Sequence, residues 1–316
     1  MKELPLYTLS KRALSTTQPS LQKSKWILIY IMLTNFMHLN KNEFKIFDCI
    51  TFYQANLLFQ LRFEILKDVV DYFIVCEANK SHSGIKKNFN FNPTIPDKYK
   101  NKIIYIQVSD LPDMKIKGKK DYKLLSIQME HLFKGIKDAQ PNDLIIFSDE
   151  DEIPNPSVIN KFDFENFKFG IFMQNMYCYK MNIMNVDEGN GNWPGPRICQ
   201  KKHLKSFFKM RLLKLKNLHY PFWRLDKERS IQLLEKGGWH FTYLMKPQEI
   251  AKKVEDMAHT EFNKLEFKKI NLIEKKIKNL KDPFNRKQNL KKVSIDETYP
   301  DYIKDNQNLY RDWILK

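Results

Sequence analysis

Apolar residues recur along the chain in two rhythms, one typical of buried strands and one typical of amphipathic helices. The run IFDCITFY at 46–53 is mainly apolar and predicts a strand. In Gln54–Val70 the apolar residues recur every three or four positions, which predicts a helix. By the same rules, we expect further strands at Tyr72–Cys76, Lys102–Val108 and Leu144–Phe147, and a further helix carrying Leu125, Met129, Leu132 and Ile136.

This alternation of strands and helices predicts the fold class. Through about 150 residues it favours an α/β domain of three layers, with a mixed, mostly parallel sheet. We expect residues 45–316 to form one domain that ends in a helical region. Its later elements are strand material at Phe169–Met184, a loop at Asp187–Pro196, a basic stretch at 201–216, a strand at Trp239–Leu244, a helix at Pro247–Met257 and a lysine-rich helix at 264–281.

The first 44 residues are expected to be an extension, partly disordered, that precedes this domain. Residues 1–25 are polar, and the apolar run Trp26–Leu33 is well short of the roughly 20 residues that a membrane span needs. Two interpretations remain for the run: a degenerate signal anchor, or a peripheral helix or non-native extension.

Charge and cysteine content narrow the class of protein. The 54 Lys and Arg against 37 Asp and Glu give a net charge of +17, which favours acidic partners such as nucleotides or anionic lipids, although biased coding also produces such a composition. The four cysteines are widely spaced and form no C-x-x-C pair, which gives no support for a zinc ribbon and favours a reducing compartment.

Four acidic residues in this basic chain follow a buried strand directly. In LIIFSDEDEIP at 144–154 they lie on a turn between a strand and a helix, where open α/β sheets bind their ligands. Asp149 and Asp151 can converge on one Mg²⁺ or Mn²⁺ ion, which would neutralise a diphosphate. The alternative is a solvated acidic turn. The chain has no Gly-rich phosphate loop, no G-x-S-x-G and no H-E-x-x-H motif, which leaves a metal-bridged diphosphate as the most economical use of the turn.

Three stretches, in this order, resemble the family 17 glycosyltransferases, the β-1,4-mannosyl-glycoprotein N-acetylglucosaminyltransferases and their bacterial and viral relatives. They are residues 46–84, LIIFSDEDEIPNP at 144–156 and GGWHFTYL at 237–244, and YPDYIKDNQNLYRDWI near the C-terminus also fits. The resemblance implies a GT-A-like fold, UDP-GlcNAc as the donor, a glycan or glycolipid acceptor, and transfer with inversion at the anomeric carbon.

The resemblance also implies roles for individual residues. It assigns the metal to Asp149 and Asp151, with His240 as a third ligand. For His240 the alternative is an imidazole satisfied within a strand. Glu77 is expected to recognise the nucleoside, and Glu152 either belongs to the acidic motif or anchors the turn. Two further donor-binding candidates are Arg197, which would contact the diphosphate, and Trp239, which would form an apolar wall for the sugar; a surface arginine and a core tryptophan are the alternatives.

Inversion requires a base that takes the proton from the acceptor hydroxyl. Glu261 is the first candidate, with His259 beside it, and Glu188 and Asp187 are the alternatives.

Two other classes of function stay open from the sequence: a metal-dependent phosphodiester hydrolase acting on nucleic acid, and a non-catalytic basic surface-binding module. The transferase hypothesis predicts no nucleic-acid partner. The lysine-rich helix either contacts an anionic membrane or presents a solvated face. We expect a cytoplasmic protein or one peripheral on the cytoplasmic membrane face, with anchoring in the secretory pathway as the alternative.

Overall fold

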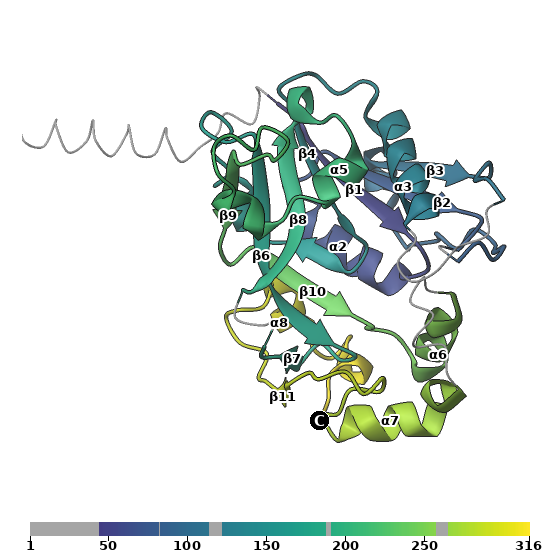
Figure 1. Ribbon diagram of the computed structural model, residues 1–316. Coiled ribbons are helices and arrows are strands. Elements are labelled where there is room, and N and C mark those ends of the chain that lie inside the picture. The colour runs from purple at the N-terminus through teal and green to yellow at the C-terminus, as the bar shows by residue number, and fades with distance from the viewer. Residues whose placement is uncertain (1–43, 82, 114–121, 188–190, 257–264) are drawn as a thin grey trace, which may run out of the picture. The chain divides into compact units, whose positions relative to one another are not determined.

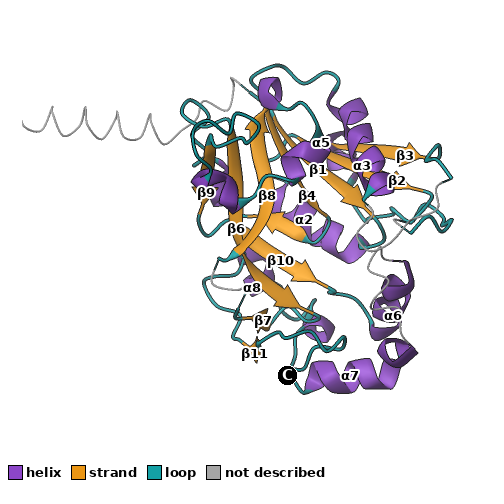
Figure 2. Cartoon of the chain, in the orientation of Figure 1, coloured by secondary structure: helices purple, strands orange, loops and turns teal. Residues whose placement is uncertain are grey.

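Strands and helices alternate through the first half of the described chain, as the apolar pattern predicts (Figures 1 and 2). The computed structural model describes residues 44–81, 83–113, 122–187, 191–256 and 265–316, all within one compact unit. The apolar run Trp26–Leu33 therefore lies outside the described residues.

Four parallel strands form one half of the central sheet. They are β1 (Ile46–Phe52), β2 (Tyr72–Ala78), β3 (Ile103–Val108) and β4 (Leu144–Asp149), in the order β3-β2-β1-β4. Because they run in the same direction, their carboxyl ends lie along one edge of the sheet, where a parallel sheet exposes its ligand-binding residues.

Helices cover both faces of this half, which gives the expected three layers. Side chains alternate along β1: Ile50 packs in one core with helix α2 (Asn56–Leu66), and Phe47 packs in a second core with helix α3 (Lys123–Glu130). Helix α2 is shorter than predicted at both ends, and the predicted second helix continues after α3 as a 3₁₀ segment, His131–Ile136.

The second half of the sheet is mixed. Strand β8 (Trp193–Gln200) runs antiparallel to β4, and the ten-residue strand β6 (Phe169–Cys178) runs antiparallel to β8. The predicted α/β class with a mixed sheet is thereby confirmed. The remaining strands attach around β6: β5 (Glu152–Pro154), β7 (Ile183–Asn185), β9 (Ile231–Leu234), β10 (Gly238–Thr242) and β11 (Leu290–Lys292).

The loop predicted at Asp187–Pro196 is partly wrong, because its last four residues belong to β8. Trp193 pairs with Gln174 and Pro194 with Met173 on β6, next to a shift in register. Strand prolines are tolerated at such irregularities, where a ladder hydrogen bond is already missing. The glycine- and proline-rich composition of the segment therefore predicted a loop where tertiary pairing forms a strand.

The lysine-rich helix is divided into a short 3₁₀ segment, Leu265–Lys268, and helix α7 (Ile270–Lys278). Its apolar side is buried as predicted, through Ile273 and Ile277, and its lysines lie on the outer side. No helix among the described residues is both long and apolar enough to cross a bilayer. The other helices are α4 (Pro156–Ile159), α5 (Phe207–Arg211), α6 (Pro247–Asp256) and α8 (Asp301–Asp305).

Candidate functional site

The acidic turn lies at the carboxyl edge of the parallel strands. Asp149 is the last residue of β4 and stands beside Thr51 of β1, while Phe52 stands beside Glu77 of β2. The chain then reverses through Glu150 and enters the short strand β5. This is the edge at which the sequence predicts a nucleotide-sugar site.

Pairing of β5 with β10 brings a distant histidine to the turn. The backbone N–H of Phe241 donates to the carbonyl oxygen of Asp151 at 2.8 Å, and His240 is paired with Glu152 in the antiparallel register. As a result, His240 Nε2 lies 3.6 Å from Asp151 Oδ2. Two of the three predicted metal ligands, 89 positions apart in the sequence, are therefore in contact.

This pair is electrostatically strong because both side chains are shielded from water. Burial alone would favour neutral groups, but the charge and the contact of His240 lower the pKa of Asp151 to about 2. Reciprocally, burial lowers the pKa of His240 while Asp151 raises it, and the net shift is upward. Lys253 of α6 adds a second positive charge: burial lowers its pKa, but Asp151 and Glu150 together outweigh that effect and raise it.

Asp149, the third predicted ligand, is paired with Arg211 and not with His240. Asp149 Oδ2 accepts a hydrogen bond of 2.6 Å from Nη2 of Arg211, at the end of α5, and its Oδ1 accepts a longer one from Arg211 Nε. Each of the two side chains is 31% exposed. Asp149 raises the pKa of Arg211, so this cation stays charged at any physiological pH.

Two of the three predicted metal ligands, Asp151 and His240, are arranged so that together they could bind a divalent cation. A carboxylate oxygen and an imidazole nitrogen lie together at Asp151 and His240, and such ligands suit Mn²⁺. His240 Nδ1 is buried and has no hydrogen-bond partner among the described residues, so they fix the ring at only one of its nitrogens. Asp149 would have to leave Arg211 to join them, and within the described ranges no three His, Cys, Asp or Glu side chains form a metal-binding group.

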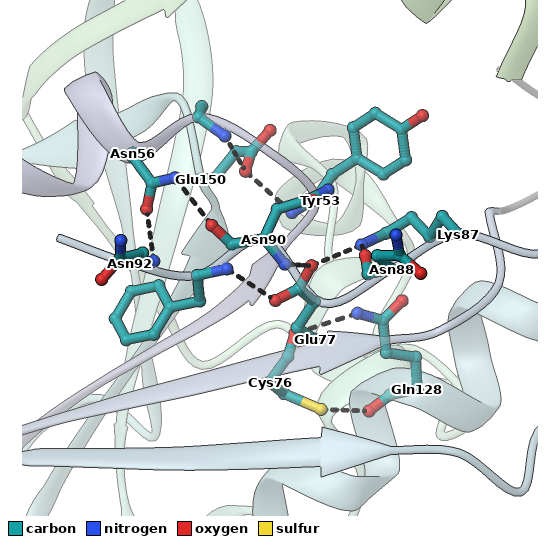
Figure 3. A network of polar contacts seen from close by, with 12 residues as sticks. Tyr53, Asn56, Cys76, Glu77, Lys87, Asn88, Asn90, Asn92, Gln128 and Glu150 are labelled. Carbon is teal, nitrogen blue, oxygen red and sulfur yellow. Dashed lines mark hydrogen bonds and ion pairs between the residues drawn. The ribbon is translucent and has the colours of Figure 1, made fainter.

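The two glutamates of the turn anchor it. Glu150 Oε2 accepts hydrogen bonds from the backbone N–H groups of Tyr53 and Ala55, just before α2, and burial raises its pKa (Figure 3). Glu152 Oε1 accepts a hydrogen bond of 2.9 Å from the indole N–H of Trp193. The structure thus supports the anchoring interpretation of Glu152.

The carboxylate of Glu77, the residue predicted to contact the nucleoside, is hydrogen-bonded to other groups of the protein (Figure 3). Its carboxylate is completely buried and accepts hydrogen bonds from the backbone N–H groups of Asn90 and Phe91, from the Tyr105 hydroxyl and from the Lys87 ammonium. A carboxylate accepts about four hydrogen bonds, so none is left for a ligand. Glu77 instead fixes the segment around residues 87–91 against the sheet edge.

Two further predicted donor-binding residues, Arg197 and Trp239, lie mostly inside the fold. Arg197 is buried, and its guanidinium donates to the carbonyl oxygens of Pro194, Gly195 and Leu213 because β8 places it inside the fold. Trp239 is a core residue, 5% exposed, whose indole N–H donates to the Thr298 carbonyl oxygen.

The tryptophan at the site is Trp193 rather than Trp239. Its ring lies 4.6 Å from the His240 ring, centroid to centroid, and its N–H holds Glu152. It borders a cavity of about 550 Å³, within the usual size of small-molecule sites, that also reaches Asp149 and Arg211. The cavity is lined by Tyr122, Phe147, Ser148, Asp149, Glu152, Trp193, Pro194, Gly195, Arg197, Arg211, Leu212, Lys214, Leu215 and Lys216.

Three members of the site were not indicated by the sequence patterns: Trp193, Arg211 and Lys253. Trp193 carried a usable signal, because an aromatic residue in a glycine-rich segment has no core periodicity to explain it. Arg211 and Lys253 stand among many basic residues, and nothing local distinguishes them. The base candidates Glu261, His259 and Glu188 lie outside the described residues, and Asp187, which is described, is exposed.

Comparison with known proteins gives a family match for part of the chain. Residues 29–182, just under half of the sequence, match the model of glycosyltransferase family 17. The matched region contains β1 to β6 and the whole acidic turn. The match supports a glycosyltransferase, and it covers the first two of the three resembling stretches but not the G-W-H strand.

Solved structures give distant likenesses. One is glucosyl-3-phosphoglycerate synthase from Mycobacterium tuberculosis in complex with Mn²⁺, UDP and phosphoglyceric acid: 12% identity, 65% of this chain, 72% of that chain, TM-score 0.32. The same enzyme with Mn²⁺, UDP-glucose and phosphoglyceric acid is 10% identical over 85% of this chain and 94% of that chain, with a TM-score of 0.33. No curated protein matches the sequence.

Proposed function

We propose that this chain is a metal-dependent, inverting glycosyltransferase with a GT-A-like arrangement, which transfers N-acetylglucosamine or a related sugar from a UDP-sugar to a glycan hydroxyl. The observation that carries the proposal is the contact between Asp151 and His240 at the end of β4. The family match over residues 29–182 supports the class of reaction. The choice of UDP-GlcNAc rests on the resemblance of the sequence motifs alone.

In this proposal Asp151 and His240 would hold Mn²⁺ or Mg²⁺, with Asp149 as a third ligand once it is free of Arg211. The bound ion would supply positive charge to the departing diphosphate. Arg211 lines the same cavity as Asp149 and would contact the diphosphate directly, the role predicted from the sequence for Arg197. Trp193 and Glu152 keep the ring of His240 and the turn in position.

The acceptor hydroxyl must lose its proton as it attacks the anomeric carbon. We keep Glu261, His259 and Glu188 as the candidates for this base. A cytoplasmic or peripheral membrane location also stays part of the proposal.

Calorimetric titration of UDP-GlcNAc, with and without Mn²⁺, tests the proposal. Binding should require the metal, and Asp151→Asn or His240→Gln should weaken it at least about tenfold, since each removes a ligand. Asp97→Asn serves as the matched control, because that carboxylate is 91% exposed and remote in sequence from the turn. UDP-glucose and UDP-galactose, run as competitors, identify the sugar.

Two results would contradict the proposal at different levels. Metal-independent binding that both variants retain would remove the metal assignment but leave a UDP-sugar protein. Absence of binding to every UDP-sugar would remove the transferase, and nucleic-acid and lipid partners would be tested next.

A further inference from the structure

A strongly basic surface adjoins the candidate site. Between residues 201 and 229 the chain carries ten basic side chains and two acidic ones, Asp226 and Glu228. The basic residues are Lys201, Lys202, Lys205, Lys209, Arg211, Lys214, Lys216, Arg224, Lys227 and Arg229. Because almost half of the net charge of the chain is concentrated here, the segment attracts anionic partners.

Within this segment the lysines line a groove of about 730 Å³. Lys205, Lys209 and Lys214 are exposed along it, and Lys168 reaches it from the start of β6. The two acidic side chains are engaged locally: Glu228 lies 3.6 Å from Lys168, and Asp226 accepts hydrogen bonds from Arg224. The acids therefore offset only a small part of the positive charge.

Large apolar side chains project from the same segment. Phe222 is 72% exposed, Trp223 66% and Leu225 91%, and all three lie in the loop between the 3₁₀ segment Leu215–His219 and β9. The rings of Phe222 and Trp223 contact each other edge to face at 5.2 Å, and Leu225 lines the lysine groove. Single exposed apolar residues are ordinary, but three within four positions mark an interaction surface.

We propose that this surface, Phe222, Trp223 and Leu225 with the lysine groove, binds an anionic lipid bilayer. Lysines near a membrane surface are attracted to acidic headgroups, and Trp and Phe partition into the interface between headgroups and acyl chains. A soluble polyanion would explain the lysines but would leave the exposed Leu225 in water. The combination of charge and apolar side chains favours a bilayer over a nucleic acid or a free glycan.

This surface is continuous with the candidate site. Leu212, Lys214 and Lys216 line both the groove and the site cavity, so a protein bound through the groove holds that cavity close to the lipid headgroups. Bilayer binding does not depend on the proposed function. Only one corollary rests on that function, namely that the acceptor glycan is carried by a lipid.

Vesicle flotation tests the proposal, with neutral phosphatidylcholine vesicles compared with vesicles that contain about 30 mol% of the acidic lipid phosphatidylglycerol. The full chain should float only with the acidic vesicles, and less so as salt rises. The triple variant Phe222→Ser, Trp223→Ser, Leu225→Ser should lower the partition coefficient about tenfold or more, since three interfacial side chains are lost. The variant Lys205→Gln, Lys209→Gln, Lys214→Gln should do the same.

The lysines of α7 provide a matched control. Lys275→Gln with Lys278→Gln removes charge from exposed positions of the other lysine-rich region, and this variant should float like the unmodified chain. The proposal is overturned if the protein does not float with acidic vesicles, or if the α7 variant loses flotation to the same extent as the groove variant. It is also overturned if RNA or a soluble anionic glycan binds the groove while the apolar variant still floats like the unmodified chain. UDP-GlcNAc titration of the apolar variant separates this outcome from failure of the transferase proposal, because its donor binding should be unchanged.

Discussion

Arg62 and Asp48 form a buried bidentate ion pair that supports the acidic turn from inside the fold. Arg62 Nε and Nη2 donate to the two oxygens of Asp48 at 2.5 and 2.6 Å, and both side chains are at most 1% exposed. Arg62 also donates to Ser148 Oγ on β4 and to the carbonyl oxygen of Glu152 on β5. One side chain of α2 thus ties together three strands that position the site.

Replacing Arg62 with methionine should destabilise the protein by about 3–5 kcal/mol, because Asp48 would remain buried without a partner. Urea denaturation followed by circular dichroism measures the effect. The double variant Asp48→Leu, Arg62→Met should recover much of the loss, since it leaves no buried charge. Arg311→Ala, which removes an arginine that is 80% exposed, should leave the free energy of unfolding unchanged. If Arg62→Met lowers the free energy of unfolding only slightly, the Arg62–Asp48 pair does not stabilise the strands that position the acidic turn.

Replacing Arg211 with alanine should strengthen Mn²⁺ binding in the absence of nucleotide. If Asp149 is a metal ligand as proposed, the ion would compete with Arg211 for it, and the gain should be roughly up to fivefold, which corresponds to the roughly 1 kcal/mol of a partly exposed ion pair. Calorimetry with Mn²⁺ alone provides the measurement. Lys209→Ala, on the same helix, controls for the general loss of a positive charge. Equal Mn²⁺ affinity in the Arg211 and Lys209 variants would argue that Asp149 is not a ligand.

Replacing Gly238 with alanine should disrupt the pairing of β10 with β5. Its φ of +130° is rarely adopted by other residues, and an added Cβ would lie 2.2 Å from the Ile153 carbonyl oxygen. We expect a large loss of stability and loss of metal-dependent UDP-GlcNAc binding, because His240 would no longer be held at Asp151. The variant Gly191→Ala separates the effect of backbone strain from that of a steric clash. Gly191 also has a positive φ, +80°, but an added Cβ would lie 3.8 Å from Glu235 Oε2, so we expect the free energy of unfolding to fall by only about 1–3 kcal/mol. Equal losses in the two variants would contradict the predicted collision.

The four cysteines should be unreactive in the folded protein. All are buried free thiols, and burial raises the pKa of Cys76 to about 12. Iodoacetamide at pH 8 should label none of them without denaturant and all four in guanidinium chloride, as mass spectrometry would show. Native-state labelling at pH 8 would contradict the buried positions.

The same thiols set a pH dependence of stability. Because the folded pKa of Cys76 is above the unfolded value of about 8.5, its contribution is intact below that pH and declines as pH rises towards about 12. The free energy of unfolding should therefore fall between these values, and Cys76→Ser should reduce the slope. If the dependence of the free energy of unfolding on pH is unchanged in Cys76→Ser, groups other than Cys76 cause it.

The parallel half of the fold was predictable because its strands are buried on both faces. The run Leu144–Phe147 is apolar throughout, Ile46–Phe52 is apolar apart from Asp48 and Thr51, and the helices between them keep a 3.6-residue period. The second half was less predictable, since its short strands attach to β6 through distant partners. Composition alone assigned Trp193 and Pro194 to a loop, although tertiary pairing draws them into β8.

The site was predicted only where local sequence determines it. The acidic turn is a local feature, and the G-W-H resemblance identified His240, which the structure places beside Asp151. Whether Trp193 or Trp239 faces the site depends on strand register, which the sequence does not encode locally. The hydrogen bonds that Asn90 and Phe91 donate to Glu77 likewise depend on how a later loop packs against the strand, so the sequence of the strand alone could not predict them.

Strand β6 has a consequence for how the molecule can be divided. The family match ends at residue 182, shortly after β6, but the strands that flank β6 on both sides, β8, β9 and β10, all follow that point. A fragment cut at residue 182 would expose two unpaired edges of an apolar ten-residue strand, the kind of surface that nucleates aggregation. The matched region therefore lacks the strands that complete β6, and we do not expect it to fold cooperatively without the rest of the chain.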